Sequence, residues 1–309
     1  MTATVVVLRA LGLGDLLTGL PALRAIADAF PEHDKVLAAP SALAPLVDLA
    51  QLPFSISDHA GPAPLPARLR RPDIAVNLHG RGPQSHAVLR ALRPGRLVAF
   101  ASQGHDGPVW RAGEHEVERW CRMLRAHGIA ADPRRIELRA PEVELDEAAR
   151  GATLLHPGAA SAARRWPAER WAAIARAERE AGRTVLLTGN PAEAALACRI
   201  AGAAGLPDDA SHAGRTDLLG LAALVAAAGR VVCGDTGVAH LATALGTPSV
   251  ILFGPVSPAE WGPPADDPRH RVLWSGGCGD PHGEEVDPGL LEIAPDAVLA
   301  QLHRLEQAA

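Results

Sequence analysis

The segment VVCGDTGVAHLATALGTPSVILFGPVSPAEWGP, residues 231–263, constrains the fold more than any other part of the chain. It predicts a short buried strand (residues 231–233), a polar turn (residues 234–237), a helix, a second strand (residues 249–253) and a loop rich in Gly and Pro. A turn of small residues after a parallel strand lets the backbone approach a ligand, and the next helix presents unpaired N–H groups to it. We therefore expect a site for a phosphorylated ligand.

The rest of the chain repeats this alternation of strand, turn and helix. Strands are expected at residues 4–8, 35–39, 73–78, 96–100, 153–156 and 184–188, and helices at residues 15–30, 42–50, 85–92, 114–127, 167–181, 192–204, 217–228 and 295–306. Residues 133–150 carry charges and two prolines, which is typical of a linker. The pattern predicts an α/β fold of two doubly wound domains, residues 1–148 and 149–309, with ligand at the carboxyl ends of the strands and the last helix packed on either domain.

Composition limits the classes of function. With 309 residues, of which 48% are hydrophobic, the chain can bury two cores of ordinary size. A formal net charge of −5 argues against a nucleic-acid partner, which would need a basic face. Lys35 is the only lysine, so phosphate recognition falls to arginine or to backbone amides. The four cysteines show no CxxC or Cys/His metal spacing, which predicts a reduced compartment and no metal site.

The apolar start of the chain, TATVVVLRALGLGDLL, is not typical of a signal sequence. It lacks a basic n-region and is interrupted by Arg9 and Asp15. No run reaches the ~18 to 20 apolar residues that span a bilayer. We expect a soluble, monomeric cytoplasmic protein, with peripheral contact at the inner face of the membrane left open.

The stretch HPGAASAARRWP, residues 156–167, is a second candidate anion site. Small residues follow a strand there, and Arg164 and Arg165 precede a helix, an arrangement suited to a diphosphate. Arg164 is the better candidate. Alternatively, one arginine is solvated and the other pairs with an acid. Trp166 and Trp261 either line the ligand site or pack as core aromatics.

The polar turn of the opening segment has a structural alternative. Asp235 or Thr236 can cap the following helix, which would still leave the amides of Gly237 and Val238 available to a ligand. His240, about one turn into that helix, is by itself more typical of a packed core histidine than of a ligand.

Asp15 lies at the first strand-to-helix turn, where a carboxylate can act as a general base toward an acceptor hydroxyl. The alternative is a helix-start acid, stabilised by the helix dipole with a lowered pKa. The same turn invites a dinucleotide-binding prediction, but Gly12 and Gly14 are not followed by the third glycine of GxGxxG. A dinucleotide oxidoreductase is therefore weakly supported.

Five spaced stretches carry a family resemblance: VVVLRALGLGDLLTGLPALRAIADAFP, VNLHGRGPQS, HEVERWCRMLRAHGI, HPGAASAARRWPAERWAAIA and GDTGVAHLATALGTPSVILFGPVSPAEWGP. Together they resemble glycosyltransferase family 9, the ADP-heptose heptosyltransferases of lipopolysaccharide core synthesis and their relatives. They cover nearly the whole chain, and several motifs in the right order are more specific than any one of them.

The resemblance implies a GT-B architecture, in which two Rossmann-like domains face each other across a cleft. The N-terminal domain would bind the acceptor and the C-terminal domain the sugar nucleotide. The aspartate of the family's leading LGD motif falls on Asp15, which the resemblance makes the catalytic base. The implied donor-binding positions are Asp235 at the transferred sugar, Thr236, Gly237 and Val238 at the diphosphate, His240 nearby, and Glu193 at the ribose.

The chain departs from the family pattern in two places. Arg164 stands where the family often has Lys, and Ala159, Ala160 and Ser161 stand where the preceding turn often carries hydroxyl groups. The implied reaction is a single displacement that inverts the anomeric configuration and needs no divalent ion or cofactor. The departing charge would be met by Arg164, with Arg165 or Ser161, and by the helix amides.

The expected substrates are a nucleotide-sugar donor, ADP-heptose by resemblance, and a glycan or lipid-linked acceptor. Acceptor pockets use variable loops, here residues 61–72 and 102–113. Residues 276–289, GGCGDPHGEEVDPG, are interpreted as a plain loop. Two other functions stay open: a sugar-nucleotide isomerase or oxidoreductase, and a non-catalytic relative that binds sugar nucleotides.

Overall fold

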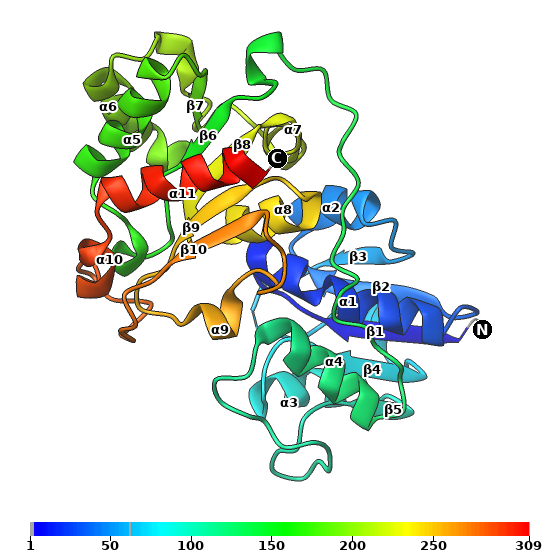
Figure 1. Cartoon of the computed structure of the whole chain (residues 1–309). Helices are drawn as coiled ribbons and strands as arrows, with labels where there is room; N and C mark the ends of the chain where they lie inside the picture. Colours follow the sequence, from blue (N-terminus) through cyan, green and yellow to red (C-terminus); the bar gives the residue numbers. More distant parts are fainter. Residues whose placement is uncertain (1–2, 62, 309) are drawn as a thin grey trace. The chain divides into compact units, whose positions relative to one another are not determined.

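The computed structural model describes residues 3–61 and 63–308, and the chain divides into two compact units (Figure 1). Unit 1 ends at Leu138 and unit 2 begins at Arg139, ten residues before the boundary expected from the sequence. Among the described residues, no helix has the length and apolar character needed to cross a membrane.

Unit 1 contains a five-stranded parallel sheet in the order β3-β2-β1-β4-β5. Its strands are β1 (Thr4–Leu8), β2 (Asp34–Ala39), β3 (Ser55–Asp58), β4 (Ile74–Asn77) and β5 (Arg96–Val98). Its helices are α1 (Leu13–Ala29), α2 (Ala44–Leu49), α3 (Gln84–Arg90) and α4 (Glu116–Ala126), with short 3₁₀ turns at Ser41–Leu43 and Ala67–Leu69.

The burial of the central strand β1 shows that this sheet is covered on both faces. Residues 5–8 are all fully buried, although successive side chains of a strand point to opposite faces. Helix α1 packs against α4, and α3 packs against β4 (Figure 1). A near-continuous β-branched run is what a strand buried on both sides requires.

Unit 2 contains a second five-stranded parallel sheet, in the order β10-β9-β8-β6-β7. Its strands are β6 (Thr153–His156), β7 (Val185–Leu187), β8 (Arg230–Gly234), β9 (Ser249–Leu252) and β10 (His270–Leu273). Its helices are α5 (Ala168–Glu180), α6 (Ala194–Ala204), α7 (Leu218–Ala227), α8 (Gly237–Leu245), α9 (Pro258–Trp261), α10 (Pro288–Glu292) and α11 (Pro295–Ala308), with 3₁₀ turns at Glu147–Ala149, Ala162–Arg164, Pro191–Glu193 and Asp208–Ala210.

The last helix, α11, packs within unit 2, against α5 and β9 (Figure 1). Its apolar residues Val298, Leu302 and Leu305 are buried in the same cluster as Trp171 and Ile174 of α5. Packing on α5 follows from the three-to-four-residue spacing of those side chains, which places them on one face of the helix.

Each sheet has one point at which the strand order reverses, between β1 and β4 in unit 1 and between β6 and β8 in unit 2. In open α/β sheets, ligands bind outside the carboxyl ends of the strands at this position. The loop after β1 leads to Asp15, and the loop after β8 begins at Asp235. The topology therefore places both carboxylates at the expected edge of their own sheet.

The sequence pattern missed two strands, β3 and β10. Each has only four residues and lies at the edge of its sheet. β3 reads SISD and β10 reads HRVL, so neither contains the apolar run that identifies β1. Helix α7 is capped by Asp217, whose side chain accepts a hydrogen bond from the Gly220 N–H.

Candidate functional site

The turn after β8 forms the first part of the candidate site in unit 2. Thr236 is the N-cap residue of α8, yet no side chain caps this helix, so the interpretation of Asp235 or Thr236 as a cap is wrong. The Thr236 hydroxyl is buried without a hydrogen-bond partner among the described residues. The first amides of α8, at Gly237 and Val238, belong to the set that a helix leaves without intrahelical partners. An uncapped helix start favours an anion.

Arg164 joins the turn after β6 to this one. Its Nη1 donates to the Asp235 carbonyl at 3.2 Å and lies 3.9 Å from Asp235 Oδ2. Burial raises the pKa of the Asp235 carboxyl to about 6, and the Arg164 charge works against that rise. The structure thus brings a guanidinium and a carboxylate together at the start of α8, although 71 residues separate them.

The other polar groups of the β6 turn bind the protein itself. Ser161 Oγ donates to the Pro281 carbonyl at 2.5 Å and lies 3.5 Å from Arg164 Nε. Arg165 is exposed, and its Nε donates to the Ala159 carbonyl at 2.8 Å. Of the two arginines, Arg164 is therefore the one that reaches the turn after β8.

The loop at residues 279–287, interpreted from the sequence as a plain connection, shapes the β6 turn. The Ala163 N–H donates to the Gly283 carbonyl, and the Asp287 N–H donates to the Ala163 carbonyl, each at 3.1 Å. Only tertiary structure shows this pairing, because the two segments lie more than a hundred residues apart and neither has a periodic pattern.

Glu193 is held by a capping box at the start of the turn that precedes α6. Its Oε2 accepts the Asn190 N–H at 2.8 Å, and Asn190 Oδ1 accepts the Glu193 N–H at 3.2 Å. The carboxylate lies against Gly158, where an added Cβ would come within 2.1 Å of Glu193 Oε1. The Glu193 carboxylate thus packs against Gly158 in the turn after β6, and its hydrogen bonds stabilise the start of the turn that precedes α6.

The two tryptophans considered from the sequence differ. Trp166 is buried, and its Nε1 donates to the Ile293 carbonyl at 3.1 Å, so it is a packed core aromatic. Trp261 is partly exposed, and its ring centroid lies 5.9 Å from that of His240. His240 and Trp261 therefore pair beside α8, while Trp166 does not line a ligand site.

Asp15 lies in the first turn of α1, with its side chain 30% exposed. Its Oδ2 accepts the Gly12 N–H at 3.3 Å. Burial raises the pKa of the Asp15 carboxyl, and the Arg9 charge opposes this rise. The lowered pKa expected for a simple helix-start acid is therefore wrong, because desolvation outweighs the nearby positive charge.

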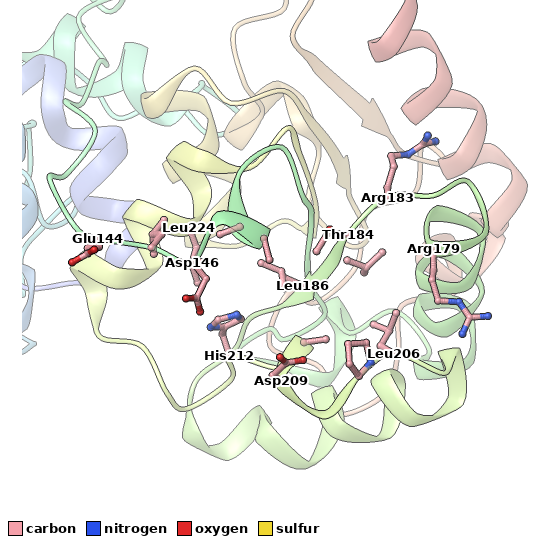
Figure 2. Close-up of a pocket in the computed structure, with 16 residues that line it drawn as sticks. Glu144, Asp146, Arg179, Arg183, Thr184, Leu186, Leu206, Asp209, His212 and Leu224 are labelled. Atoms are coloured by element: carbon pink, nitrogen blue, oxygen red, sulfur yellow. The ribbon is translucent and has the colours of Figure 1, made fainter.

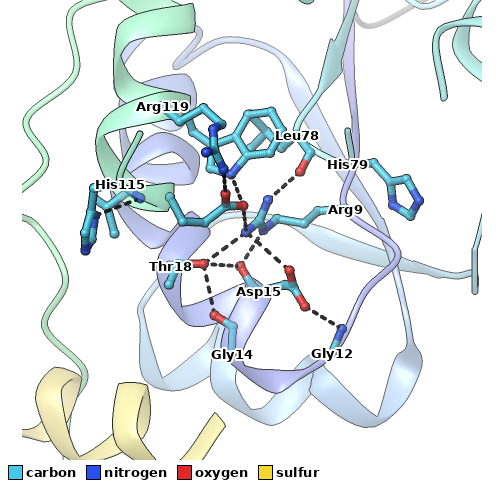
Figure 3. Close-up of polar contacts among 12 residues, drawn as sticks. Arg9, Gly12, Gly14, Asp15, Thr18, Leu78, His79, His115 and Arg119 are labelled. Atoms are coloured by element: carbon cyan, nitrogen blue, oxygen red, sulfur yellow. Dashed lines mark hydrogen bonds and ion pairs between the residues drawn. The ribbon is translucent and has the colours of Figure 1, made fainter. Parts of the chain in front are cut away.

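Arg9, which interrupts an apolar run in the sequence, lies close to this carboxylate, with its Nη2 4.0 Å from Asp15 Oδ1 (Figure 3). Its side chain is fully buried. It donates to the backbone carbonyls of Asp15 and Leu78, to Thr18 Oγ1 at 3.0 Å and to Glu116 Oε1 at 3.3 Å. An arginine directly after a buried strand is costly unless it is paired, so its position in the sequence could have indicated a buried charge network here.

His79 follows β4 at the same edge of the sheet (Figure 3). Its Nδ1 is buried and has no hydrogen-bond partner among the described residues. Burial lowers the pKa of its imidazole, with the Arg9 charge acting in the same direction. A neutral imidazole at the same edge of the sheet as Asp15, and within electrostatic reach of it, can bind a hydroxyl group, so His79 is a candidate that sequence reasoning missed.

A cavity of about 650 Å³ in unit 2 lies away from these residues (Figure 2). It is lined by the linker around Asp146, by β7 and by the segment around His212. Its two arginines are already engaged, Arg179 with the Gly205 carbonyl and Arg183 with Glu178. None of the residues described in the turns after β6 and β8 lines this cavity, so it is not the candidate site. No group of His, Cys, Asp and Glu able to hold a metal ion occurs among the residues described.

Comparison with known protein families identifies the family of this chain. The model of glycosyltransferase family 9 (heptosyltransferase) matches residues 83–279. The chain belongs to glycosyltransferase family 9. The match includes the turns after β6 and β8, and it confirms the resemblance carried by the sequence motifs.

The curated relatives of this family 9 protein match parts of it. Lipopolysaccharide heptosyltransferase 2 of Salmonella typhimurium is 31% identical over 150 residues, which cover 46% of this chain and 43% of the relative. Lipopolysaccharide heptosyltransferase 1 of Pseudomonas aeruginosa is 42% identical over 94 residues, 30% of this chain and 26% of the relative. The matched segments thus span less than half of either relative.

Solved structures match the whole fold. E. coli ADP-heptose lps heptosyltransferase II superposes with a TM-score of 0.74 at 22% identity, covering 99% of this chain and 100% of that one. A glycosyl transferase family 9 structure from Veillonella parvula gives 0.78 at 18% identity, with 99% and 98% covered. The E. coli heptosyltransferase WaaC with ADP gives 0.72 at 20% identity, with 98% and 99% covered. These matches confirm the α/β fold of the GT-B class.

Proposed function

We propose that this protein is an inverting, metal-independent glycosyltransferase that moves a heptose or related sugar from a nucleotide donor to a glycan or lipid-linked acceptor. The observation that carries the proposal is the uncapped start of α8, where the buried Thr236 hydroxyl has no partner among the described residues and Arg164 lies alongside. Such a site suits a diphosphate. The names of the curated relatives and the ADP in the WaaC structure favour ADP-heptose.

In the proposed reaction, Asp15 takes the proton of an acceptor hydroxyl while that oxygen attacks the anomeric carbon. The bond between this carbon and the diphosphate oxygen breaks on the opposite face, and the nucleoside diphosphate leaves. Arg164 and the α8 amides stabilise the departing negative charge, a task that needs no divalent cation. Asp235 holds the transferred sugar, and Glu193, with His240 nearby, contributes to the nucleotide pocket. One displacement inverts the anomeric configuration.

The test begins with donor recognition. Thermal unfolding is measured with ADP, UDP, GDP and their sugar conjugates, because a true ligand at about 100 times its Kd raises the free energy of unfolding by about 2.7 kcal/mol. We expect ADP and ADP-heptose to give the largest shift, with and without EDTA. Equal shifts for all nucleotides would contradict the assignment of the donor base.

Transfer is then followed as ADP release in the presence of an acceptor extract. We expect release by the native protein, its loss in Asp15→Asn, and no change in the control Asp48→Asn, which alters an exposed acid on α2. Retained nucleotide binding in Asp15→Asn excludes a folding defect. Release that needs a divalent cation, or that persists in Asp15→Asn, would contradict the mechanism. An isomerase or oxidoreductase would convert the sugar nucleotide without releasing ADP.

A further inference from the structure

A buried network of charges connects Asp15 to α4 (Figure 3). Glu116, the first residue of α4, accepts a hydrogen bond from Arg9 and another from Trp120 Nε1 at 2.7 Å, and it also pairs with Arg119. The Arg9 guanidinium lies 5.2 Å from the centroid of the Trp120 ring. Burying a guanidinium is costly unless all its donors find acceptors, so this network is tightly specified.

Arg9 makes no hydrogen bond to the Asp15 carboxylate. Arg9 Nη2 lies 4.0 Å from Asp15 Oδ1, beyond hydrogen-bond distance, while the donors of Arg9 serve the main chain, Thr18 and Glu116. The positive charge therefore acts on Asp15 through space without occupying the oxygen that a substrate proton would need. A bidentate Arg–Asp pair would have blocked it.

Helix α1 is shaped to accept this arginine. Gly19 lies inside the helix, where glycine is about 1 kcal/mol less favourable than alanine. A Cβ at Gly19 would come within 2.7 Å of Arg9 Nε and 2.9 Å of its Cδ. Those atoms are in the middle of a side chain that is fixed at its far end, so they have little freedom to move aside.

We propose that Arg9, oriented by Glu116, is the positioning residue of Asp15: it fixes the first turn of α1 and supplies a positive charge that favours the ionised carboxylate without covering it. The proposal rests on the proposed function only in taking Asp15 as the base. It assigns a positioning role to Arg9 and Glu116, two residues that do not themselves touch substrate.

The experiment measures Asp15 directly. Protein labelled with carbon-13 at the aspartate carboxyl carbon is titrated by NMR, with Asp15→Asn used to assign the signal. In Arg9→Met the pKa of Asp15 is expected to rise by about one unit or more, because a neighbouring opposite charge typically lowers a carboxyl pKa by 1 to 3 units. The acidic limb of the pH profile of kcat/KM moves to higher pH by the same amount.

Arg9→Lys separates charge from geometry. An ammonium retains the charge but cannot reach all the acceptors of a planar guanidinium. We expect the pKa of Asp15 to stay near its native value while kcat falls about 10- to 100-fold through misplacement of the carboxylate.

Gly19→Ala is expected to lower kcat as well, although helix propensity alone predicts a more stable α1. Glu116→Gln is expected to move the Asp15 titration less than Arg9→Met does.

Arg183→Met is the matched control. Arg183 also pairs with a buried glutamate, its Nε lying 2.9 Å from Glu178 Oε2, but in unit 2. We expect this variant to lose stability with no change in the Asp15 titration.

An unchanged Asp15 titration in Arg9→Met with a pH-independent loss of activity would overturn the proposal. If Arg9→Met does not fold, native kcat in both Arg9→Lys and Gly19→Ala overturns it. Absence of transfer by the native protein, with the NMR shift present, overturns the proposed function and supports the electrostatic role of Arg9.

Discussion

Asp15 in unit 1 and Asp235 in unit 2 have similar surroundings but differ in how far their side chains are exposed. Each follows a buried parallel strand at the switch point of its sheet, and each has an arginine nitrogen about 4 Å from a carboxylate oxygen, at 4.0 and 3.9 Å. Burial raises the pKa of both. Their side chains are 30% and 9% exposed.

The difference in exposure fits the different tasks proposed for these two carboxylates. A base must meet the hydroxyl that it deprotonates, so the proposed role of Asp15 requires an accessible oxygen and a charge partner that is occupied elsewhere, as Arg9 is by Glu116. Arg164 pairs with no carboxylate other than Asp235 among the described contacts. This arrangement is consistent with the proposed role of Arg164 at the diphosphate. Four experiments test this contrast.

The largest effect is expected from Asp15→Asn, which removes the proposed proton acceptor. We expect the rate of transfer to fall about 10²- to 10⁴-fold, the usual contribution of a general base, with nucleotide affinity unchanged. ADP release and calorimetric binding check this. If Asp235→Asn lowers the rate as much and also leaves binding intact, the proposed division of tasks between the two carboxylates is wrong.

The second experiment uses stability, without any ligand. The folded protein binds a proton at Asp235 with a pKa of about 6, above the ordinary value of 3.8. Stability is therefore lost as the pH rises through that interval, because the buried carboxylate must ionise. Asp235→Asn removes this penalty and should raise the free energy of unfolding at pH 7.5 by on the order of 3 kcal/mol. Denaturant unfolding at pH 7.5 and pH 4 measures it, and an equal gain at both values would contradict the cause given.

Arg164→Met should weaken ADP binding about 10- to 100-fold, the equivalent of one hydrogen bond to a charged group. Arg164→Lys restores part of that affinity, because charge is kept and the planar fork is lost. Isothermal titration measures both. Arg165→Met serves as the control, since Arg165 binds its own turn and should change the affinity little. Equal losses in the two methionine variants would mean that Arg165 shares the site.

The smallest effect is expected from Thr236→Val. The Thr236 hydroxyl is buried without a partner among the described residues, so its removal should leave the free protein as stable as before or slightly more stable. ADP affinity should nevertheless fall about fivefold, as expected for about 1 kcal/mol from one neutral hydrogen bond. A loss of stability without a loss of affinity would show that the hydroxyl has a structural partner instead.

The sequence by itself determined the local elements and the position of Asp15 and Asp235 at the carboxyl edges of their sheets. The run at residues 4–8 and the segment at residues 231–263 have the periodicities of a buried strand and a strand–turn–helix unit, and short-range sterics and burial are enough to specify these. The prediction of Arg164 as an anion-binding candidate followed from its position before a helix, and it stays a prediction. In the free protein Arg164 lies beside Asp235 and Arg165 is exposed, which is the arrangement that the structural alternative described.

Tertiary structure alone decided which side chains meet. Arg9 and Glu116 are separated by 107 residues, and nothing in either local sequence names the other. The same holds for Ser161 and the loop at Pro281, and for Trp166, whose partner is the Ile293 carbonyl. Desolvation depends on everything packed around a group, so the raised pKa of Asp15 could not be read from its place at a helix start, where the dipole alone predicts the opposite direction.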